Sequence, residues 1–279
     1  MVEEIRDLRL RTGITVPCLV QGVRGRPLVL LHAWAESRGS FDRLVPLLTD
    51  FRVYAPDLRG QGDAEKPTTG YSLAEQAEDA AAVLDALGIP RAVVLGSSSG
   101  GYVAQQLAVS HPDRVSALVL VSAPSSLHGR APFADAVDRL TDPISEDWVR
   151  ESLSWYSLQP SIPGWFIEDR IRDGVRMPAH AWRGILDGLT TATPPTEAGT
   201  IRAPSLILWG ARDTLVPLRD QEALAARITS DVRLSVFEDA GHLLLWEQPD
   251  RIASEVAEFL RVPARATRRP GGRRSGAGE

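Results

Sequence analysis

The stretch Val93–Ala108, VVLGSSSGGYVAQQLA, decides which fold the sequence predicts. Its first residues form a continuous apolar run, which is typical of a β-strand buried on both faces of a sheet. Its last residues have the polarity pattern of a helix, which Pro112 ends. Only glycines and three serines lie between the two. The segment therefore predicts a buried parallel strand joined by a sharp turn to a helix.

Apolar runs and helical patterns alternate along most of the chain. Besides the strand pattern at residues 92–97, similar runs cover residues 27–33, 51–57, 116–123 and 205–210. A helical pattern follows Ser72, and residues 8–22 resemble an antiparallel pair at the edge of a sheet. We therefore expect an α/β fold with a mostly parallel, doubly wound central sheet and helices on both faces.

One interval interrupts this alternation. Roughly eighty residues separate the strand patterns that end at Ala123 and begin at Ser205, where a single helix would be enough. The interval holds four of the seven tryptophans and many prolines. We predict that residues 124–204 form a helical cap over a core made of residues 1–123 and 205–262.

Length and composition are those of an ordinary globular protein. The chain has 279 residues, of which 43% are hydrophobic and 24% are charged. No apolar run approaches the roughly 20 residues that span a bilayer, and the charged start MVEEIRDLRL lacks the apolar core of a signal peptide. We therefore expect a cytoplasmic protein without a membrane partner. The single cysteine, Cys18, fits that compartment, and we interpret it as a small buried hydrophobe.

The last residues differ from the rest in composition. Residues 263–279 are rich in proline, glycine and arginine, and five arginines fall between residues 265 and 274. Because this stretch has no apolar periodicity, we predict that it is a disordered basic tail. The net charge is −5 in spite of those arginines, and the rest of the chain carries no basic stripe. We therefore expect no nucleic-acid partner.

The pentapeptide at residues 96–100 fits the pattern G-x-S-x-G, in which Ser98 is the central serine. A serine on a sharp strand-to-helix turn stands above the sheet, and the residues two positions away must be small. The first amides of the helix point to where negative charge develops during acyl transfer. We predict that Ser98 is a nucleophile. Ser97 and Ser99 are interpreted as small residues that fit the turn.

A nucleophilic serine needs a general base, and that base needs an acid to orient it. His242 follows the last strand pattern and precedes the final helix, where the last member of the order Ser, Asp, His belongs. Asp213 follows the strand pattern that ends at Gly210. We predict that His242 is the base and Asp213 the acid. Asp239, close to His242 in sequence, is the alternative acid.

Five segments in order resemble the landmarks of the α/β-hydrolase superfamily. They are LVLLHAW, APDLRGQGDAEKP, VLGSSSGG, ILWGARDTLVP and AGHLLLWEQPD. The resemblance runs from about Val16 to Leu260 and puts the insertion in the position of the family's cap. It implies the α/β-hydrolase fold, in a cap-bearing branch with a serine nucleophile that is similar to esterases and lactonases.

The resemblance also implies an oxyanion hole formed by the backbone N–H groups of Trp34 and Ser99. Ser99 is then expected to act through its backbone rather than its hydroxyl. The family commonly has glycine where this chain has Ala33. If that position requires a positive φ, alanine strains the loop by about 1 kcal/mol.

The identity of the nucleophile selects among the reactions of this superfamily. Relatives that displace halide or open epoxides carry aspartate at the elbow. A carboxylate forms an alkyl ester that water can cleave, whereas a serine would leave an inert ether. Ser98 therefore indicates hydrolysis of a carboxylic ester or lactone through an acyl-enzyme. No metal or cofactor is needed, and the histidines show no ligand spacing.

Other activities that use the same triad stay open. Carbon–carbon bond hydrolases typically carry Asn before the nucleophile and Trp after the histidine, where this chain has Ser97 and Leu243. We therefore rank that activity below ester or lactone cleavage. A cofactor-free perhydrolase and a non-catalytic ligand receptor on the same fold are further alternatives.

The aromatic insertion indicates that the partner is a small apolar or aromatic substrate of the ester or lactone type. The candidate substrate contacts are Trp34, Trp155, Trp165 and Trp182. The insertion also carries arginines, which we interpret as solvated helix faces rather than carboxylate clamps. These are Arg170, Arg172, Arg176 and Arg183.

Overall fold

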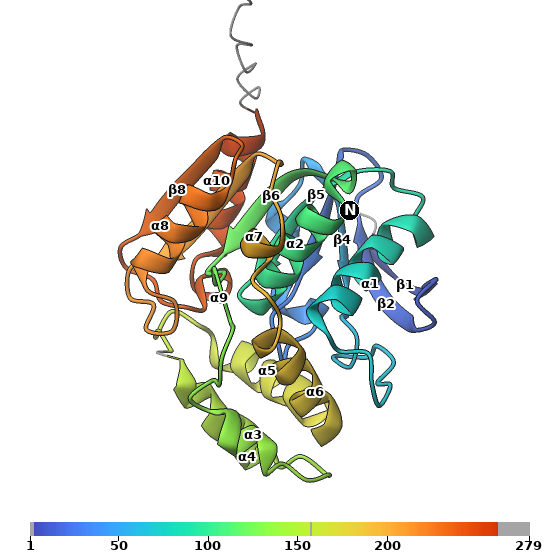
Figure 1. Ribbon diagram of the computed structural model, residues 1–279, viewed down its shortest axis with the longest axis vertical. Helices are drawn as coiled ribbons and strands as arrows, with labels where there is room; N and C mark the ends of the chain where they lie inside the picture. The colour runs from blue at the N-terminus through green and yellow to red at the C-terminus, as the bar shows by residue number, and fades with distance from the viewer. Residues whose placement is uncertain (1–2, 157, 262–279) are drawn as a thin grey trace, which may run out of the picture.

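A sheet of eight strands organises the computed structural model, which describes residues 3–156 and 158–261 (Figure 1). The strand order is β1-β2-β4-β3-β5-β6-β7-β8. β1 pairs with β2 and β2 with β4 in antiparallel fashion, and all other pairs are parallel. The predicted mostly parallel sheet with an antiparallel edge is confirmed. The strands are β1 (Glu3–Arg9), β2 (Thr15–Gln21), β3 (Arg26–Leu31), β4 (Phe51–Pro56), β5 (Ala92–Ser97), β6 (Val115–Val121), β7 (Ser205–Gly210) and β8 (Val232–Phe237).

Alternate residues of the central strands serve two separate hydrophobic clusters, one on each face. In β3, Leu28 and Leu30 belong to one cluster while Val29 and Leu31 belong to the other. Because side chains alternate across a strand, a strand buried on both faces must be apolar at every position. The helices α1 (Leu73–Ala86), α2 (Ser99–Ser110) and α8 (Leu218–Arg227) cover the Val29 face, and α9 (Leu244–Glu247) and α10 (Pro249–Arg261) cover the Leu28 face.

Helix α1 starts at a capping box, and several of the connecting segments contain short 3₁₀ turns. Ser72 accepts from the Glu75 backbone N–H, while the Glu75 carboxylate accepts from the Ser72 backbone N–H. This reciprocal pair satisfies amides that a helix start leaves free. The 3₁₀ turns are η1 (Arg38–Phe41), η2 (Val45–Leu47), η3 (Pro112–Arg114) and η4 (Leu153–Trp155).

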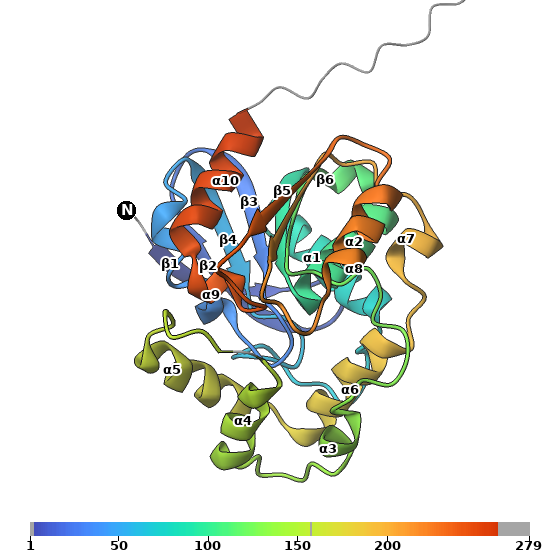
Figure 2. The ribbon, with the colours of Figure 1, turned by 90° about the vertical axis from the view of Figure 1, so that its left-hand side faces the viewer.

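The segment between β6 and β7, residues 124–204, is a mainly helical insertion. Its helices α3 to α6 gather at one end of the molecule, while α7 lies beside α2 (Figures 1 and 2). Two of its side chains are fully buried and pack against residues outside it, Trp182 against Trp34 and Phe166 against Trp246. The predicted tail at residues 263–279 lies outside the described residues. The helices of the insertion are α3 (Ala134–Asp138), α4 (Glu146–Ser152), α5 (Gly164–Val175), α6 (Ala179–Thr190) and α7 (Pro195–Ala198).

Cys18 lies in β2 and has no exposed surface. Burial raises the pKa of its thiol to about 12, so the sulfur stays protonated at neutral pH. The interpretation of Cys18 as a small buried hydrophobe is confirmed. Among residues 3–156 and 158–261, no helix has the length and apolar character needed to cross a membrane.

Candidate active site

Ser98 stands on the turn between β5 and α2 with φ +48° and ψ −120°. The glycines two positions to either side, Gly96 and Gly100, leave the room that this turn needs. A Cβ on Gly96 would lie 2.4 Å from the Gly100 carbonyl oxygen, and one on Gly100 would lie 2.3 Å from the Leu31 carbonyl oxygen. Contacts that close exclude any side chain. The small residues of G-x-S-x-G are therefore needed for the turn itself.

The side chains of Ser98, His242 and Asp213 form one hydrogen-bonded chain. His242 Nε2 lies 3.0 Å from Ser98 Oγ, and His242 Nδ1 lies 2.8 Å from Asp213 Oδ2. Since a carboxylate only accepts, Nδ1 carries the proton and Nε2 is free to accept the one from Ser98. The structure thus brings together the three residues that the sequence selected from three separate loops. Asp239 is exposed and contacts Gln248 instead.

Backbone amides hold the acid and the base in place. Asp213 Oδ1 accepts from the N–H groups of Leu215 at 2.8 Å and Val216 at 3.0 Å, which leaves Oδ2 for His242. The buried carboxylate of Glu247 accepts from the Gly241 N–H at 2.7 Å and so fixes the loop that carries His242. Burial raises the pKa of Glu247. These contacts orient both partners before any substrate arrives.

The predicted oxyanion hole contains a contact that the sequence did not predict. The Trp34 N–H donates to Ser99 Oγ at 2.7 Å. The hydroxyl of Ser99, and not only its backbone, therefore belongs to this part of the site. The strain expected at Ala33 is absent, because the positive φ of this loop falls at Ala35, with φ +64°. The Ala35 N–H donates to Gln61 Oε1 at 2.7 Å, which holds the loop in that conformation.

His32, which is fully buried, holds the loop that carries Trp34 and Ala35 through two hydrogen bonds. Its Nδ1 lies 2.8 Å from the Ala33 carbonyl oxygen, and its Nε2 accepts from the Leu58 N–H at 2.9 Å. This pair of bonds is possible only for a neutral imidazole with the proton on Nδ1. Burial lowers the pKa of His32.

We expect the stability to depend on pH through His32. The unfolded chain binds a proton at this histidine near pH 6.5, whereas the folded chain resists it. The free energy of unfolding should therefore decrease as the pH falls below about 6.5. His32→Ala should cost about 1–3 kcal/mol at pH 7, because it orphans the Leu58 amide, and should flatten this dependence. Thermal unfolding of the wild type and of His32→Ala at pH 5 to 8 checks both expectations. If the free energy of unfolding changed with pH equally in the two proteins, His32 would not be the source of the dependence.

A cavity of about 390 Å³ opens on the Ser98 hydroxyl. Its floor is formed by Ser98, Ser99, Trp34 and His242, and its walls come from the insertion and from the loop that follows β7. The apolar part of the wall is Leu127, Ala131, Pro132, Phe133, Leu186, Leu189, Leu215 and Val216. A cavity of this size and lining accommodates a small, largely apolar molecule.

Comparison with known proteins agrees with the fold. The sequence model of the alpha/beta hydrolase fold matches residues 26–249. The chain belongs to the α/β-hydrolase fold family. A 2-hydroxymuconate semialdehyde hydrolase of Pseudomonas putida is 34% identical to this α/β hydrolase over 222 residues, which cover 75% of this chain and 76% of the relative.

Two further relatives cover more of this α/β hydrolase. A pimeloyl-[acyl-carrier protein] methyl ester esterase of Neisseria meningitidis is 29% identical over 84% of this chain and 93% of its own. The crystal structure of a hydrolase from Pseudomonas aeruginosa superposes with a TM-score of 0.78 at 27% identity. That match covers 93% of this chain and 99% of the other. The expected family and fold are confirmed.

The four tryptophans chosen as substrate contacts have different positions in this α/β hydrolase. Trp34 lines the cavity that contains Ser98. Trp155 and Trp182 pack behind it, with ring centroids 6.4 and 5.0 Å from that of Trp34. Trp165 is 58% exposed, meets Phe166 edge to face and does not line the Ser98 cavity. Of the four, only Trp34 lines the Ser98 cavity.

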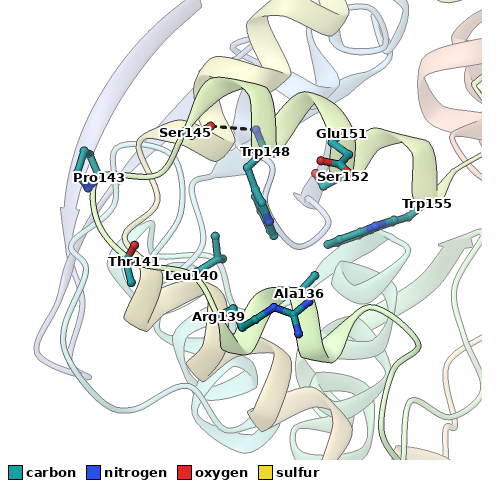
Figure 3. A pocket seen from close by; sticks show the side chains of 10 residues that line it. All are labelled: Ala136, Arg139, Leu140, Thr141, Pro143, Ser145, Trp148, Glu151, Ser152 and Trp155. Atoms are coloured by element: carbon teal, nitrogen blue, oxygen red, sulfur yellow. Dashed lines mark hydrogen bonds between the residues drawn. The ribbon is translucent and has the colours of Figure 1, made fainter.

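A second cavity, of about 510 Å³, lies within the insertion between α3 and α4. Trp148 and Trp155 project into it, and Arg139, the residue after α3, faces them (Figure 3). The Trp155 ring stacks on Phe133 with centroids 4.4 Å apart, and Phe133 lines the Ser98 cavity. These stacked aromatic rings therefore stand between the two cavities.

The interpretation of Arg170 as a solvated residue is wrong. Its side chain is 7% exposed and lies over the Phe166 ring at 5.0 Å. Nε is 3.2 Å from Asp173 Oδ2, in a direction that makes no hydrogen bond, and Nη1 has no hydrogen-bond partner within the described residues. Glu36 is buried near it, and burial raises the Glu36 pKa. Arg172 keeps the expected exposure.

Tyr156 is another residue that the sequence did not single out. Its ring stacks on the His242 imidazole with centroids 5.6 Å apart and an interplanar angle of 10°. The contact joins the insertion directly to the base. No local pattern could have revealed it, because the two residues lie far apart in sequence and Tyr156 follows a short 3₁₀ turn rather than a periodic helix.

Proposed function

We propose that this α/β hydrolase is a serine hydrolase that cleaves a carboxylic ester or a lactone through an acyl-enzyme intermediate. The observation that carries the proposal is the chain of hydrogen bonds from Ser98 through His242 to Asp213, which opens on a largely apolar cavity. A serine alone on a turn has no base to activate it. Here the base is within hydrogen-bond distance and is itself oriented by a buried carboxylate.

In the first half of the reaction, Ser98 Oγ attacks the acyl carbon and its proton passes to His242 Nε2. Asp213 stabilises the imidazolium, and the oxyanion forms near the amides of Trp34 and Ser99. His242 then gives the proton to the leaving oxygen, and the acyl group stays on Ser98. In the second half, a water that loses its proton to His242 cleaves this ester and releases the acid.

The shape of the cavity supports a substrate with an apolar acyl group or ring. Its walls carry leucines and Phe133 from the insertion, and Arg130 lines part of it. Burying apolar groups against such walls contributes about 25 cal/mol per Å² of apolar surface. A relative named as a methyl ester esterase supports an ester bond as the one cleaved.

Two measurements test this proposal. A fluorophosphonate probe should label the wild-type protein and leave Ser98→Ala unlabelled. A panel of p-nitrophenyl esters, aryl esters, lactones and thioesters, with Ser98→Ala as the blank, then identifies the acyl group and the leaving group. The same panel with hydrogen peroxide added measures perhydrolysis. Absence of both labelling and turnover would contradict the proposal and favour a non-catalytic ligand receptor.

Carbon–carbon bond hydrolysis is the second candidate. Relatives named 2-hydroxymuconate semialdehyde hydrolase, which are carbon–carbon bond hydrolases, support it at 33–34% identity. So does Nη1 of Arg170, which has no hydrogen-bond partner among residues 3–156 and 158–261, because this guanidinium lines a small cavity that is also lined by Trp34 and Tyr156. A cation there suits a substrate that carries a carboxylate. Ser97 and Leu243 still depart from the residues typical of those enzymes.

Replacement of Arg170 separates the two candidates. If the substrate carries a carboxylate, Arg170→Gln should lower kcat/KM for 2-hydroxymuconate semialdehyde by about 10- to 100-fold, the usual value of a charged hydrogen bond. Turnover of p-nitrophenyl acetate should change less than twofold. Arg172→Gln, an exposed change on the same helix, is the matched control. A lack of turnover of the semialdehyde by the wild type would remove this candidate.

A further inference from the structure

The Ser99 hydroxyl occupies the space in front of the Trp34 amide. That amide donates to Ser99 Oγ at 2.7 Å. The backbone N–H of Ser99 is the first of helix α2 and makes no hydrogen bond with any described residue. Both Ser98 and Ser99 line the same cavity. An acyl oxygen that approaches these two amides therefore meets the hydroxyl as well.

The surrounding backbone holds Ser99 and Trp34 at this hydrogen-bond distance. A Cβ on Gly100 would lie 2.3 Å from the carbonyl oxygens of both Leu31 and His32, so the start of α2 touches the end of β3 directly. His32 ties the following loop to the Leu58 amide. Because α2 packs so closely against β3 and His32 anchors the loop, the fold itself places the Ser99 hydroxyl beside the Trp34 N–H.

The hydrogen bond leaves the hydroxyl with a free proton. A serine hydroxyl has one donor and two acceptor positions. Ser99 Oγ accepts from Trp34, and among the described residues no acceptor takes its own proton. Accepting a hydrogen bond polarises an O–H group and strengthens the bond that it donates. Bonds from a hydroxyl to an oxyanion are short and strong.

We propose that the Ser99 hydroxyl, polarised by the Trp34 N–H, donates to the oxyanion beside the backbone N–H of Ser99 and takes the place of the Trp34 amide, whose single proton it accepts. The inference rests on the proposed serine-hydrolase function. When the bond from Ser98 Oγ to the acyl carbon forms, the carbonyl π electrons move onto the oxygen. That charge returns to the C=O bond when the leaving group departs. Ser99 keeps its proton throughout, and its contribution is largest in the transition state, so it raises kcat rather than lowering KM.

The test compares Ser99→Ala, Ser99→Cys and Ser99→Thr with Ser97→Ala, the same small change on the other side of the nucleophile. With p-nitrophenyl acetate, Ser99→Ala should lower kcat about 100-fold with KM changed less than twofold. Ser99→Cys, whose thiol is a weak donor, should lose at least about tenfold, and it serves alone if the alanine variant does not fold. Ser99→Thr, which keeps the hydroxyl, should retain most activity.

A binding measurement distinguishes a donor from a group that merely fills space. Affinity for a trifluoromethyl ketone, which forms an oxyanion on Ser98, should fall in Ser99→Ala by the same factor as kcat, while affinity for the product acid stays unchanged. Equal or higher activity and ketone affinity in both Ser99→Ala and Ser99→Cys would overturn the inference, because the hydroxyl would then only block the hole. If the wild type hydrolysed no ester at all, the proposed serine-hydrolase function itself would be refuted.

Discussion

Ser98→Ala is expected to lower kcat for p-nitrophenyl acetate by about 10⁴-fold or more. The substitution removes the atom that forms the acyl bond and leaves the oxyanion hole, which accounts for the residual rate. Active-site titration with a fluorophosphonate gives the concentration of active wild-type enzyme, and a burst of p-nitrophenol in its pre-steady state measures acylation directly. The variant should show neither labelling nor a burst.

The backbone of Ser98 supplies a control that separates chemistry from folding. Its φ of +48° strains any residue with a side chain. Ser98→Gly should therefore be as inactive as Ser98→Ala but about 1 kcal/mol more stable to thermal unfolding. His242→Ala should lose a similar amount of activity, and the double variant should lose little more, because the two side chains act as one unit. Retention of more than a few per cent of activity in Ser98→Ala would identify a different nucleophile.

Asp213→Asn is expected to lower kcat by about 10⁴-fold. The reason lies in the two contacts of the acid. One oxygen accepts from the amides of Leu215 and Val216, and an Asn carbonyl oxygen would keep that place. Its NH₂ group would then face His242 Nδ1 and donate to it. The imidazole proton would move to Nε2, so that the base could no longer accept the proton of Ser98.

The matched control for this change is Asp239→Asn. Asp239 is exposed, and its carboxylate accepts from Gln248 at 2.8 Å. We expect kcat to change less than twofold, as for most surface substitutions. Measurement of kcat and KM for both variants, with thermal unfolding as a check of the fold, decides between the two acids. A large loss in Asp239→Asn together with a small one in Asp213→Asn would reverse the assignment.

The fold was predictable because its signals are local. Strands buried on both faces must be apolar at every position, and that pattern marked β5 and β7 with the same bounds as in the structure. The bounds of β3 and β6 differ by one or two residues at their ends, where loop residues such as Ala33 and Ala123 remain apolar. Those residues are buried in loops near Ser98 rather than in the sheet.

The insertion was far less predictable. Arg170 has the composition of a solvated helix face, yet it is buried between Phe166 and the Gly39 backbone. Trp165, on the same helix, is exposed although it is one of the largest apolar side chains. Short helices broken by prolines show no long periodic face, so the sequence does not indicate which side of each helix meets the core.

The sheet, the sharp turn at Ser98 and the choice of His242 and Asp213 could be predicted, because each follows from local spacing and from chain order. Three features became visible only in the folded chain. The Ser99 hydroxyl accepts a hydrogen bond from the Trp34 amide, and Tyr156 stacks on His242. Of the tryptophans chosen as substrate contacts, Trp34 alone lines the Ser98 cavity. Each of these is a contact between side chains or loops far apart in the chain. Such contacts depend on how the insertion and the loops pack against the sheet, and no pattern of neighbouring residues encodes that packing.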